Sequence, residues 1–460
     1  MNKNFTKKIL FVVSECRPFV ASGGLADVTG SLPSQLIKQG LTVDVVMPLY
    51  QSIKRKFGKD LVKIETKDVY LDYRKQQTNL YSIDCSGVKY YFIDYDYYYD
   101  RPNLYGYDDD IERFTFFCTA VISFFQDKYD IFHCHDWQTA LIPTLLKMTK
   151  PTKRTILTIH NIDYQGKFAV GQLQDLTGLS SNFLGIFEWQ GSCNLLKSGI
   201  VMCDKLTTVS PSYADEIQLS YYSAGLCDII MQNRYKLVGI LNGIDTLNYS
   251  SSLDTNLVAN FDASTLANKK LCKHQLQQTL GLPQNDLPLF CMVTRLATHK
   301  GLDLVKSVIP YFLQKNIQFA ILGTGEKEYE EFFASLSKTN DNCACVIDFN
   351  NVLAKLIYGG ADYLIMPSLS EPCGLSQMIA CRYATLPIVR RVGGLGDSII
   401  NNKQGIVFDD YDTTSLSLAW QKGIDIYLTP IFDEMRRYAL ATDFSWEISS
   451  QEYIKLYKSI

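Results

Sequence analysis

Short runs of apolar, β-branched residues recur along the chain, and most are followed by a segment with helical periodicity. Such runs predict buried strands of parallel sheets joined by helices. The first series of predicted strands lies at residues 9–13, 43–47, 130–133, 155–159 and 206–209. The second lies at 289–294, 318–322, 344–348, 363–366, 386–389 and 405–408. Two such series predict an α/β protein with two doubly wound, Rossmann-like domains.

Residues 61–95 show a different pattern, with strand-like stretches close together at 69–73, 79–84 and 89–93. Cys85, Ser86 and Gly87 form a turn signal between the last two stretches. Because this spacing leaves no room for helices, we predict an antiparallel insertion at about 61–95 within the first domain.

The apolar pattern restarts after a polar, aperiodic segment at residues 249–261, which we interpret as a linker. The predicted domains are therefore residues 1–248 and 249–440, and residues 441–460 are expected to form a helix that packs back on the first domain. Ligands of doubly wound folds bind beyond the carboxyl ends of the strands, in the cleft that such domains enclose. Polar residues that follow a predicted strand are therefore the first candidates for function.

Composition excludes several classes of protein. The 460 residues carry 45 Lys and Arg against 48 Asp and Glu, a net charge of −3, which argues against a nucleic-acid binder. The run at 9–13 is too short for a signal peptide or a membrane span, so we expect a soluble, cytoplasmic protein. The 13 scattered cysteines are expected to be reduced thiols. The 5 histidines lack zinc-ligand spacing, and the acidic run 108–110 is typical of a solvated surface, so no metal site is predicted.

Three loops in the first half place polar groups at strand ends. Gly23 and Gly24 precede a helical run, where free amides suit an anion; the alternative is a plain strand-to-helix turn. Asp136 and His160 follow the strands at 130–133 and 155–159, where both side chains can bind sugar hydroxyls. The alternatives are a helix-capping aspartate and a histidine satisfied within the core.

The second half carries charged groups at comparable positions. Arg295 and Lys300 follow the strand at 289–294 and can neutralise a diphosphate without a metal, unless they are a solvated pair. Gly323 follows the next strand, although residues 323–325 lack the dinucleotide spacing. Glu371 follows the strand at 363–366, where it can meet a sugar or instead cap a helix. The amides that can face a phosphate beside it belong to Cys373, Gly374 and Leu375.

Tyrosines crowd residues 90–107, among them Tyr95, and Tyr164 follows His160. Aromatic faces stack on sugars, so these residues are candidates for the acceptor side of a sugar site. Packing in the core and in a rigid surface loop is the alternative for most of the residues in this segment.

In their order along the chain, these motifs resemble those of the bacterial glycogen synthase and plant starch synthase family. The matching stretches are 23–28, 91–94, 104–107, 133–137, 158–161 with 164–166, 208–211, 241–245, 295–303, 367–368, 371–375, 390–395 and 443–446. Each motif alone is weak, whereas the ordered set is specific and spans nearly the whole chain.

The resemblance implies the GT-B fold, with two facing Rossmann-like domains. It also implies transfer of glucose from ADP-glucose to the non-reducing end of an α-1,4-glucan, with retention of configuration and without a metal or cofactor. By motif, Arg295 and Lys300 would hold the diphosphate, and Glu371 would hold the donor glucose. The other donor-binding residues would be Gly23, Gly24, Gly323, Cys373, Gly374 and Leu375. Asp136 and His160 would line the glucose side of the cleft, and the acceptor-side candidates are Tyr95, Asp136 and Tyr164.

One position departs from the family pattern. The first motif of the family usually reads Lys-x-Gly-Gly-Leu, with the lysine near the donor phosphates, whereas this chain has Ala21. Loss of one charge-assisted contact predicts weaker donor binding, by about 1.5–3 kcal/mol. Ser370 also replaces an aromatic residue that is common before Glu371.

Two alternatives remain open from the sequence. A related transferase could use UDP-glucose, but many such enzymes carry Glu-x7-Glu, and the eighth residue after Glu371 is Ile379. A non-catalytic glucan-binding or chain-initiation factor is supported by Ala21 alone.

Overall fold

The computed structural model describes residues 6–460, which form two compact units. Unit 1 ends at Asn242 and includes the segment Trp446–Ile460, and unit 2 spans Gly243–Ser445. Residues 243–248 and 441–445 thus belong to unit 2, whereas the sequence analysis assigns 243–248 to the first domain and 441–445 to the terminal helix. The backbone explains this difference, because Ile244 N–H donates to the Phe444 carbonyl at 2.8 Å and ties the two segments together.

Within the described residues, unit 1 contains a nine-stranded sheet. In spatial order its strands are β12 (Leu237–Gly239), β11 (Lys205–Thr208), β7 (Arg154–Ile159), β6 (Ile131–His135), β1 (Lys8–Val12), β2 (Thr42–Pro48), β5 (Val88–Asp94), β4 (Arg74–Cys85) and β3 (Val62–Leu71). Pairing is parallel from β12 to β5. All five strands of the first predicted series are confirmed, with ends shifted by one or two residues.

Helices cover the buried strands of this sheet. Ile9, Leu10, Phe11 and Val12 of β1 are all fully buried, which requires cover on both faces of the sheet. The helices of unit 1 are α1 (Gly24–Lys38), α2 (Gln51–Phe57), α3 (Asp96–Tyr99), α4 (Asp110–Phe125), α5 (Leu141–Thr149), α6 (Leu173–Thr177), α7 (Leu184–Phe187), α8 (Leu195–Met202), α9 (Pro211–Glu216), α10 (Cys227–Gln232) and α19 (Trp446–Lys458). A small antiparallel sheet contains β8 (Lys167–Phe168), β10 (Ser192–Asn194) and β9 (Glu188–Trp189).

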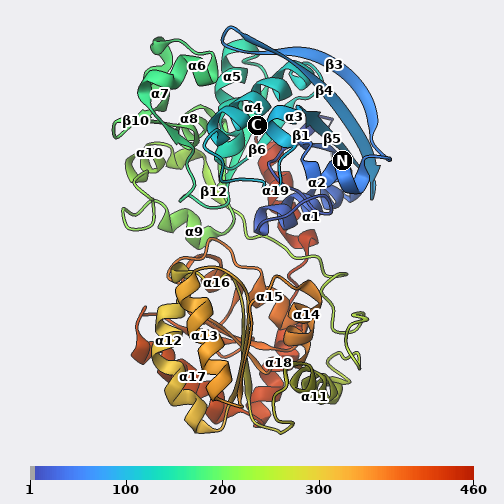
Figure 1. The fold of residues 1–460 in the computed structure, drawn as a ribbon, viewed down its shortest axis with the longest axis vertical. Helices are drawn as coiled ribbons and strands as arrows, with labels where there is room; N and C mark the ends of the chain where they lie inside the picture. Colours follow the sequence, from blue (N-terminus) through green and yellow to red (C-terminus); the bar gives the residue numbers. More distant parts are fainter. Residues whose placement is uncertain (1–5) are drawn as a thin grey trace. The chain divides into compact units, whose positions relative to one another are not determined.

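The predicted antiparallel insertion is correct for two of its three strands. The hairpin β3–β4, drawn in blue in Figure 1, forms the antiparallel edge of the sheet. The third strand, β5, pairs antiparallel with β4 but parallel with β2, so it belongs to the main sheet. The predicted strand 69–73 is too long at its end, because β3 stops at Leu71 and Asp72, with a φ of 49°, turns the chain toward β4.

The last helix completes unit 1. Helix α19, red in Figure 1, contacts the blue helix α1. Its Tyr457 hydroxyl lies 2.8 Å from Nδ1 of His133 on β6, and Ser449 donates to the Leu241 carbonyl at 2.6 Å. These bonds join the end of the chain to the centre of the sheet.

Unit 2 contains a parallel six-stranded sheet among the residues described. In spatial order its strands are β15 (Cys343–Val346), β14 (Gln318–Leu322), β13 (Leu289–Val293), β16 (Tyr363–Met366), β17 (Leu386–Arg390) and β18 (Ile406–Phe408). Each overlaps a predicted strand of the second series. The helices are α11 (Lys269–Leu280), α12 (Leu302–Phe312), α13 (Lys327–Thr339), α14 (Asn351–Gly360), α15 (Ser376–Arg382), α16 (Gly393–Ser398), α17 (Thr413–Ile426) and α18 (Pro430–Ala441).

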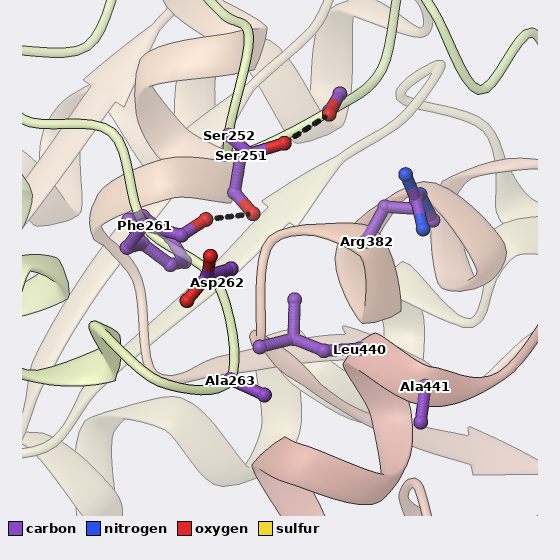
Figure 2. A pocket seen from close by; sticks show the side chains of 9 residues that line it. Ser251, Ser252, Phe261, Asp262, Ala263, Arg382, Leu440 and Ala441 are labelled. Carbon is purple, nitrogen blue, oxygen red and sulfur yellow. Dashed lines mark hydrogen bonds between the residues drawn. The ribbon is translucent and has the colours of Figure 1, made fainter.

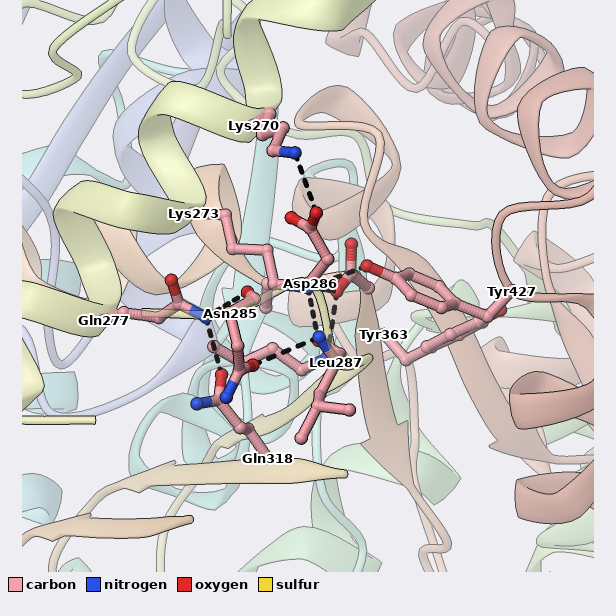
Figure 3. A network of polar contacts seen from close by, with 12 residues as sticks. Lys270, Lys273, Gln277, Asn285, Asp286, Leu287, Gln318, Tyr363 and Tyr427 are labelled. Atoms are coloured by element: carbon pink, nitrogen blue, oxygen red, sulfur yellow. Dashed lines mark hydrogen bonds and ion pairs between the residues drawn. The ribbon is translucent and has the colours of Figure 1, made fainter. Parts of the chain in front are cut away.

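A buried ion pair anchors α11 at the amino-terminal edge of this sheet (Figure 3). Lys273 Nζ lies 2.6 Å from Asp362 Oδ2 and also donates to the hydroxyl of Tyr427 at 2.8 Å. Asp362 accepts the backbone N–H of Leu289 at 2.9 Å. Since both charges are paired and hydrogen-bonded, the network is a structural anchor. It lies at the strand edge opposite the carboxyl ends.

Candidate active-site residues

In unit 1, the carboxylate of Asp136 joins the loops that follow β6 and β7. Its Oδ1 accepts the backbone N–H of His160 at 2.7 Å and that of Asn161 at 3.4 Å, and its own N–H donates to the Thr158 carbonyl. The side chain makes no cap bond to the short helix η1 (Trp137–Thr139) that follows it. The helix-cap alternative is therefore wrong for this residue.

The environment of Asp136 favours its protonated form. Burial raises the pKa of Asp136 to about 7, although the two backbone N–H groups lower it and the charge of Glu15 raises it further. Its φ of 57° is unusual for a non-glycine residue and is held by the bonds on both sides of it. Asp136 is thus a fixed carboxyl group at the strand edge that can hydrogen-bond a sugar hydroxyl.

His160 is the outermost of a cluster of three histidines. Its Nε2 lies 3.0 Å from Nδ1 of His135, whose ring stacks on that of His133 with centroids 4.3 Å apart. Burial lowers the pKa of both His133 and His160 to about 3 and that of His135 well below its usual value. All three rings are therefore neutral near pH 7. His133 and His135 are core residues, whereas His160 is half-buried and stays accessible.

Glu15 is a carboxylate in this region that the sequence analysis does not single out. It follows β1, the neighbour of β6, and only 3% of it is exposed. Its Oε2 accepts the backbone N–H of Ser22 at 2.5 Å, and burial raises the pKa of its carboxyl group. Glu15 therefore holds the loop that carries Gly23 and Gly24. Its position two residues beyond the apolar run 9–13 is the signal that could have identified it.

The glycine loop is exposed, and the cation nearest to it in sequence is paired with a carboxylate. Ser22, Gly23 and Gly24 are exposed and lead into α1, with Gly23 as the N-cap residue in an extended conformation. Arg17, the nearest cation in sequence, pairs with Asp27 of α1 at 2.6 Å. Its guanidinium is therefore occupied, and it does not take the place of the lysine absent at Ala21.

The two tyrosine candidates lie in different loops of unit 1. Tyr95 follows β5, three strands from β6 in the sheet, which is about 14 Å at normal strand spacing. Its ring packs against Tyr98 and Phe116, with centroids 5.1 and 5.0 Å away. Tyr164 lies in the loop after His160 and is 54% exposed. Of the two, Tyr164 has the more available aromatic face.

In unit 2, Lys300 and Glu371 form a mostly buried ion pair. Nζ of Lys300 lies 2.6 Å from Oε2 of Glu371, and their side chains are 16% and 8% exposed. The Ser368 hydroxyl donates to the same oxygen at 3.3 Å. Lys300 ends η6 (Thr298–Lys300), after β13, and Glu371 follows β16, the strand next to β13. The helix-cap alternative is wrong for Glu371, because its carboxylate binds Lys300 instead.

Close backbone packing brings the two loops together. Gly301, with φ +73°, lies where a Cβ atom would come within 2.1 Å of the Pro367 carbonyl oxygen. Leu369 N–H also donates to the His299 carbonyl at 2.9 Å. Only glycine fits at position 301, so this residue determines how closely Lys300 approaches Glu371.

Arg295 differs from Lys300 in its environment. It is exposed, and among residues 6–460 no ion pair or side-chain hydrogen bond is found for its guanidinium. Gly323 supports the backbone beside it, since a Cβ atom there would lie 1.9 Å from the Thr294 carbonyl oxygen. Arg295 is thus a free cation at the carboxyl edge of the sheet, available to an anion.

The segment 373–375 leads into α15 next to Glu371. Gly374 has φ +70°, and Leu375 is the N-cap residue without a side-chain cap bond. The Glu371 carbonyl accepts the N–H of Gly394 at 3.1 Å, and a Cβ atom on Gly394 would clash with Cys373. The backbone of this segment is therefore fixed by the glycine loop after β17.

Phe349 is a second residue that the sequence analysis missed. It follows β15 at the same carboxyl edge of the sheet, and it is 73% exposed. A large aromatic side chain exposed at a ligand-binding edge is suited to stacking on a flat ring. The predicted strand 344–348 ends just before it, so its place at a strand end was the available signal.

A shallow pocket of about 240 Å³ lies elsewhere in unit 2 (Figure 2). It is lined by residues 250–252 and 261–263, Arg382, Leu440 and Ala441, none of which is a site candidate. Over residues 6–460 no three His, Cys, Asp or Glu side chains are grouped as metal ligands would be. In the same range, no helix combines the length and apolar character needed to cross a membrane.

Two family models match the sequence. The model described as the starch synthase catalytic domain matches residues 8–232. The model described as glycosyl transferases group 1 matches residues 277–428. Each match lies within one of the two units.

Similarity to named relatives extends over nearly the whole chain. Glycogen synthase from Geobacillus thermodenitrificans is 39% identical over 473 aligned residues, 98% of each chain. Glycogen synthase from Oceanobacillus iheyensis is 40% identical over 472 residues, covering 99% of this chain and 98% of the relative. Two relatives from different bacteria thus match nearly their full length.

Solved structures also match nearly the whole chain. The catalytic domain of starch synthase IV from Arabidopsis thaliana, bound to ADP and acarbose, is 29% identical and covers 99% of both chains with a TM-score of 0.91. Sucrose-phosphate synthase from Thermosynechococcus elongatus, at 16% identity and a TM-score of 0.61 over 98% of both chains, supports the fold alone. The predicted GT-B fold is confirmed.

Proposed function

The chain belongs to the glycogen synthase family, and on that premise we propose that it transfers glucose from ADP-glucose to the non-reducing end of an α-1,4-glucan with retention of configuration. The observation that carries this proposal is identity to glycogen synthases along nearly the whole chain. The ADP in the related starch synthase IV structure supports the adenine nucleotide.

The proposed donor site lies on unit 2. Arg295 and Lys300 bind the diphosphate, and the amides of Cys373, Gly374 and Leu375 bind its distal phosphate. When the bond to glucose breaks, negative charge accumulates on the diphosphate, and fixed cations stabilise that charge most in the transition state. The reaction therefore needs no metal or cofactor in this proposal.

Glu371 binds the donor glucose beside Lys300. A carboxylate there orients a sugar hydroxyl and stabilises positive charge that develops at the reacting carbon. Its ion pair with Lys300 holds the carboxylate in place at the strand edge. Phe349 stacks on the nucleobase, which its exposure and its place after β15 support.

The proposed sugar-binding groups of unit 1 are Asp136 and His160, with Tyr164 as an acceptor contact. Tyr95 stays an acceptor-side candidate at greater distance from Asp136. No side chain is assigned as general base. Instead, a phosphate oxygen of the leaving ADP accepts the proton of the attacking acceptor hydroxyl on the same face of the sugar.

We propose a cytoplasmic location, which the 13 free thiols support, because oxidising compartments favour disulfides.

UDP-glucose is the alternative donor. A non-catalytic, glucan-binding role is the second alternative, and Ala21 is the observation that favours it.

A transfer assay separates these possibilities. Purified full-length protein is incubated with glycogen and labelled ADP-glucose or UDP-glucose, with and without EDTA. We expect faster transfer from ADP-glucose, unchanged by EDTA. Equal or faster transfer from UDP-glucose contradicts the donor, and loss of activity in EDTA contradicts metal independence. Glycogen binding without transfer from either donor supports the non-catalytic alternative.

A further inference from the structure

His135, a fully buried residue outside the proposed substrate contacts, bonds directly to the ring of His160. We propose that His135 is a positioning residue that fixes the tautomer of His160, so that His160 presents Nδ1–H to the substrate as a hydrogen-bond donor. The part that concerns substrate rests on the proposed function; the part that concerns the tautomer does not.

The contact between the two rings contains a single proton. Nδ1 of His135 and Nε2 of His160 lie 3.0 Å apart, which is hydrogen-bond distance. Burial keeps both rings neutral, so each ring has one N–H group and one bare nitrogen. One proton therefore lies between the two rings, and it belongs either to His135 or to His160.

The other nitrogen of His135 decides between these arrangements. Its Nε2 is buried and has no hydrogen-bond partner among the described residues. If His160 donated, this Nε2 would carry a proton and become a buried N–H without an acceptor, which native proteins rarely contain. If His135 donates through Nδ1, its Nε2 carries no proton and no donor is lost. The geometry therefore favours His135 as the donor.

Packing holds the His135 ring in this orientation. The ring of His133 stacks on it with an interplanar angle of 28°, and Phe11 contacts it with a centroid distance of 5.2 Å. His133 itself is held by Tyr457 at Nδ1 and by Thr158 at Nε2. Rotation of the His135 ring would break the stack as well as the bond to His160.

The bond from His135 fixes the tautomer of His160. Its Nε2 accepts from His135, so its proton is on Nδ1, the ring nitrogen with no protein partner among the described residues. Its backbone N–H is bound by Asp136 at 2.7 Å, which fixes the residue from the other side. His160 thus offers a donor to a sugar oxygen and does not offer an acceptor.

Nuclear magnetic resonance of the full chain with ¹⁵N-labelled histidine tests the tautomer directly. The chain has 5 histidines, so single His→Gln variants assign every ring. We expect His160 to be protonated at Nδ1 in the unmodified protein and to lose this single tautomer in His135→Leu. His274→Gln, a change on α11 in unit 2 that touches none of the three clustered histidines, is the control and leaves the His160 ring shifts in place. Protonation of His160 at Nε2, or an unchanged His160 in His135→Leu, overturns the proposal.

Kinetics provide a second readout. The amide of Asn lies near the place of Nδ1 in His and can donate, whereas Leu cannot. We expect His135→Leu to lower kcat about tenfold with unchanged ADP affinity, and His135→Asn to recover a large part of kcat. No recovery in a folded His135→Asn protein contradicts the role of the donor. If the unmodified protein transfers no glucose, the proposed function fails, while the resonance experiment still decides the tautomer.

Discussion

Nζ of Lys300 lies 2.6 Å from Oε2 of Glu371, so the cation proposed for the donor phosphates and the carboxylate proposed for the donor sugar are bound to each other. The two side chains come from loops after adjacent strands, and a glycine at position 301 allows their close approach. This relationship means that substitution of either residue changes stability as well as catalysis.

Lys300→Met is expected to destabilise the protein by about 2 kcal/mol, because it leaves the mostly buried Glu371 without its partner. Lys300→Met/Glu371→Gln is expected to recover part of this loss, because no uncompensated charge remains. Urea unfolding measures both variants. Lys306→Met provides a control, since its 2.6 Å pair with Glu328 is exposed and should change stability by less than about 0.5 kcal/mol. Equal losses of stability in Lys300→Met and Lys306→Met would contradict the expectation that the buried ion pair matters more than the exposed one.

Arg295→Ala is expected to reduce kcat by about 10²-fold and to weaken ADP binding, with little change in stability. The reason is its exposure and the absence of an ion-pair partner among residues 6–460, which leave its charge free for the leaving diphosphate. Steady-state kinetics, ADP titration and urea unfolding on the same preparation make the comparison. A change confined to KM would show that Arg295 does not stabilise the transition state.

Ala21→Lys is expected to lower the KM for the donor about tenfold, which corresponds to about 1.4 kcal/mol. The new ammonium restores the family pattern in a loop whose nearest sequence cation, Arg17, is held by Asp27. Ala21→Met adds a chain of comparable length without charge and is the matched control. The same gain in both variants would assign the effect to packing, and no gain in either would show that another group already binds the phosphate.

Phe349→Ala is expected to weaken ADP binding about tenfold, because loss of base stacking costs about 1–3 kcal/mol. Stability should change little, since the side chain is 73% exposed. Phe349→Tyr keeps the aromatic face and should retain affinity. Calorimetric titration with ADP measures both, and an unchanged affinity in Phe349→Ala would remove the residue from the site.

Acid is expected to destabilise unit 1 through its histidine cluster. His133 and His160 have pKa values of about 3 in the folded protein, against about 6.5 when unfolded, and His135 is shifted in the same direction. Below pH 6 the unfolded chain therefore binds three more protons on these residues. Asp136 opposes this trend by one proton, because its folded pKa is raised to about 7.

The histidines therefore predict that stability falls as the pH is lowered from about 6 to 4.5, and the raised pKa of Glu15 opposes this fall together with that of Asp136. Urea unfolding at several pH values measures this slope. His133→Gln removes one titrating group, so its slope should be smaller by about 1.4 kcal/mol per pH unit. A slope unchanged by that substitution contradicts the assignment.

The strands were predictable from the sequence because a buried strand of a parallel sheet appears as a short, continuous run of apolar residues. Runs such as 9–13 and 363–366 are apolar on both faces, and the matching strands β1 and β16 are buried on both faces. The candidates Asp136, His160, Arg295 and Glu371 were accessible to the same reasoning, because each lies within five residues after such a run.

Sequence reasoning did not predict which of these residues meet. Strand order decides that, and it is set by pairing between segments far apart in the chain: β13 lies beside β16, and β1 lies beside β6. Through this order Lys300 reaches Glu371, and Glu15 lies close enough to Asp136 to raise its pKa. The parallel role of β5 was missed for the same reason, since its neighbour β2 is distant in sequence.

The sequence by itself determined the two βα series, the family and the residues available at strand ends, because these depend on local pattern and motif order. The tertiary structure alone decided the partners of those residues. Burial, which is a property of the packed chain, set the neutral state of the histidines and the raised pKa of Asp136. Packing also left the side chains of Arg295 and Phe349 exposed to solvent. It placed Arg17 beside Asp27, so that these two charges form an ion pair.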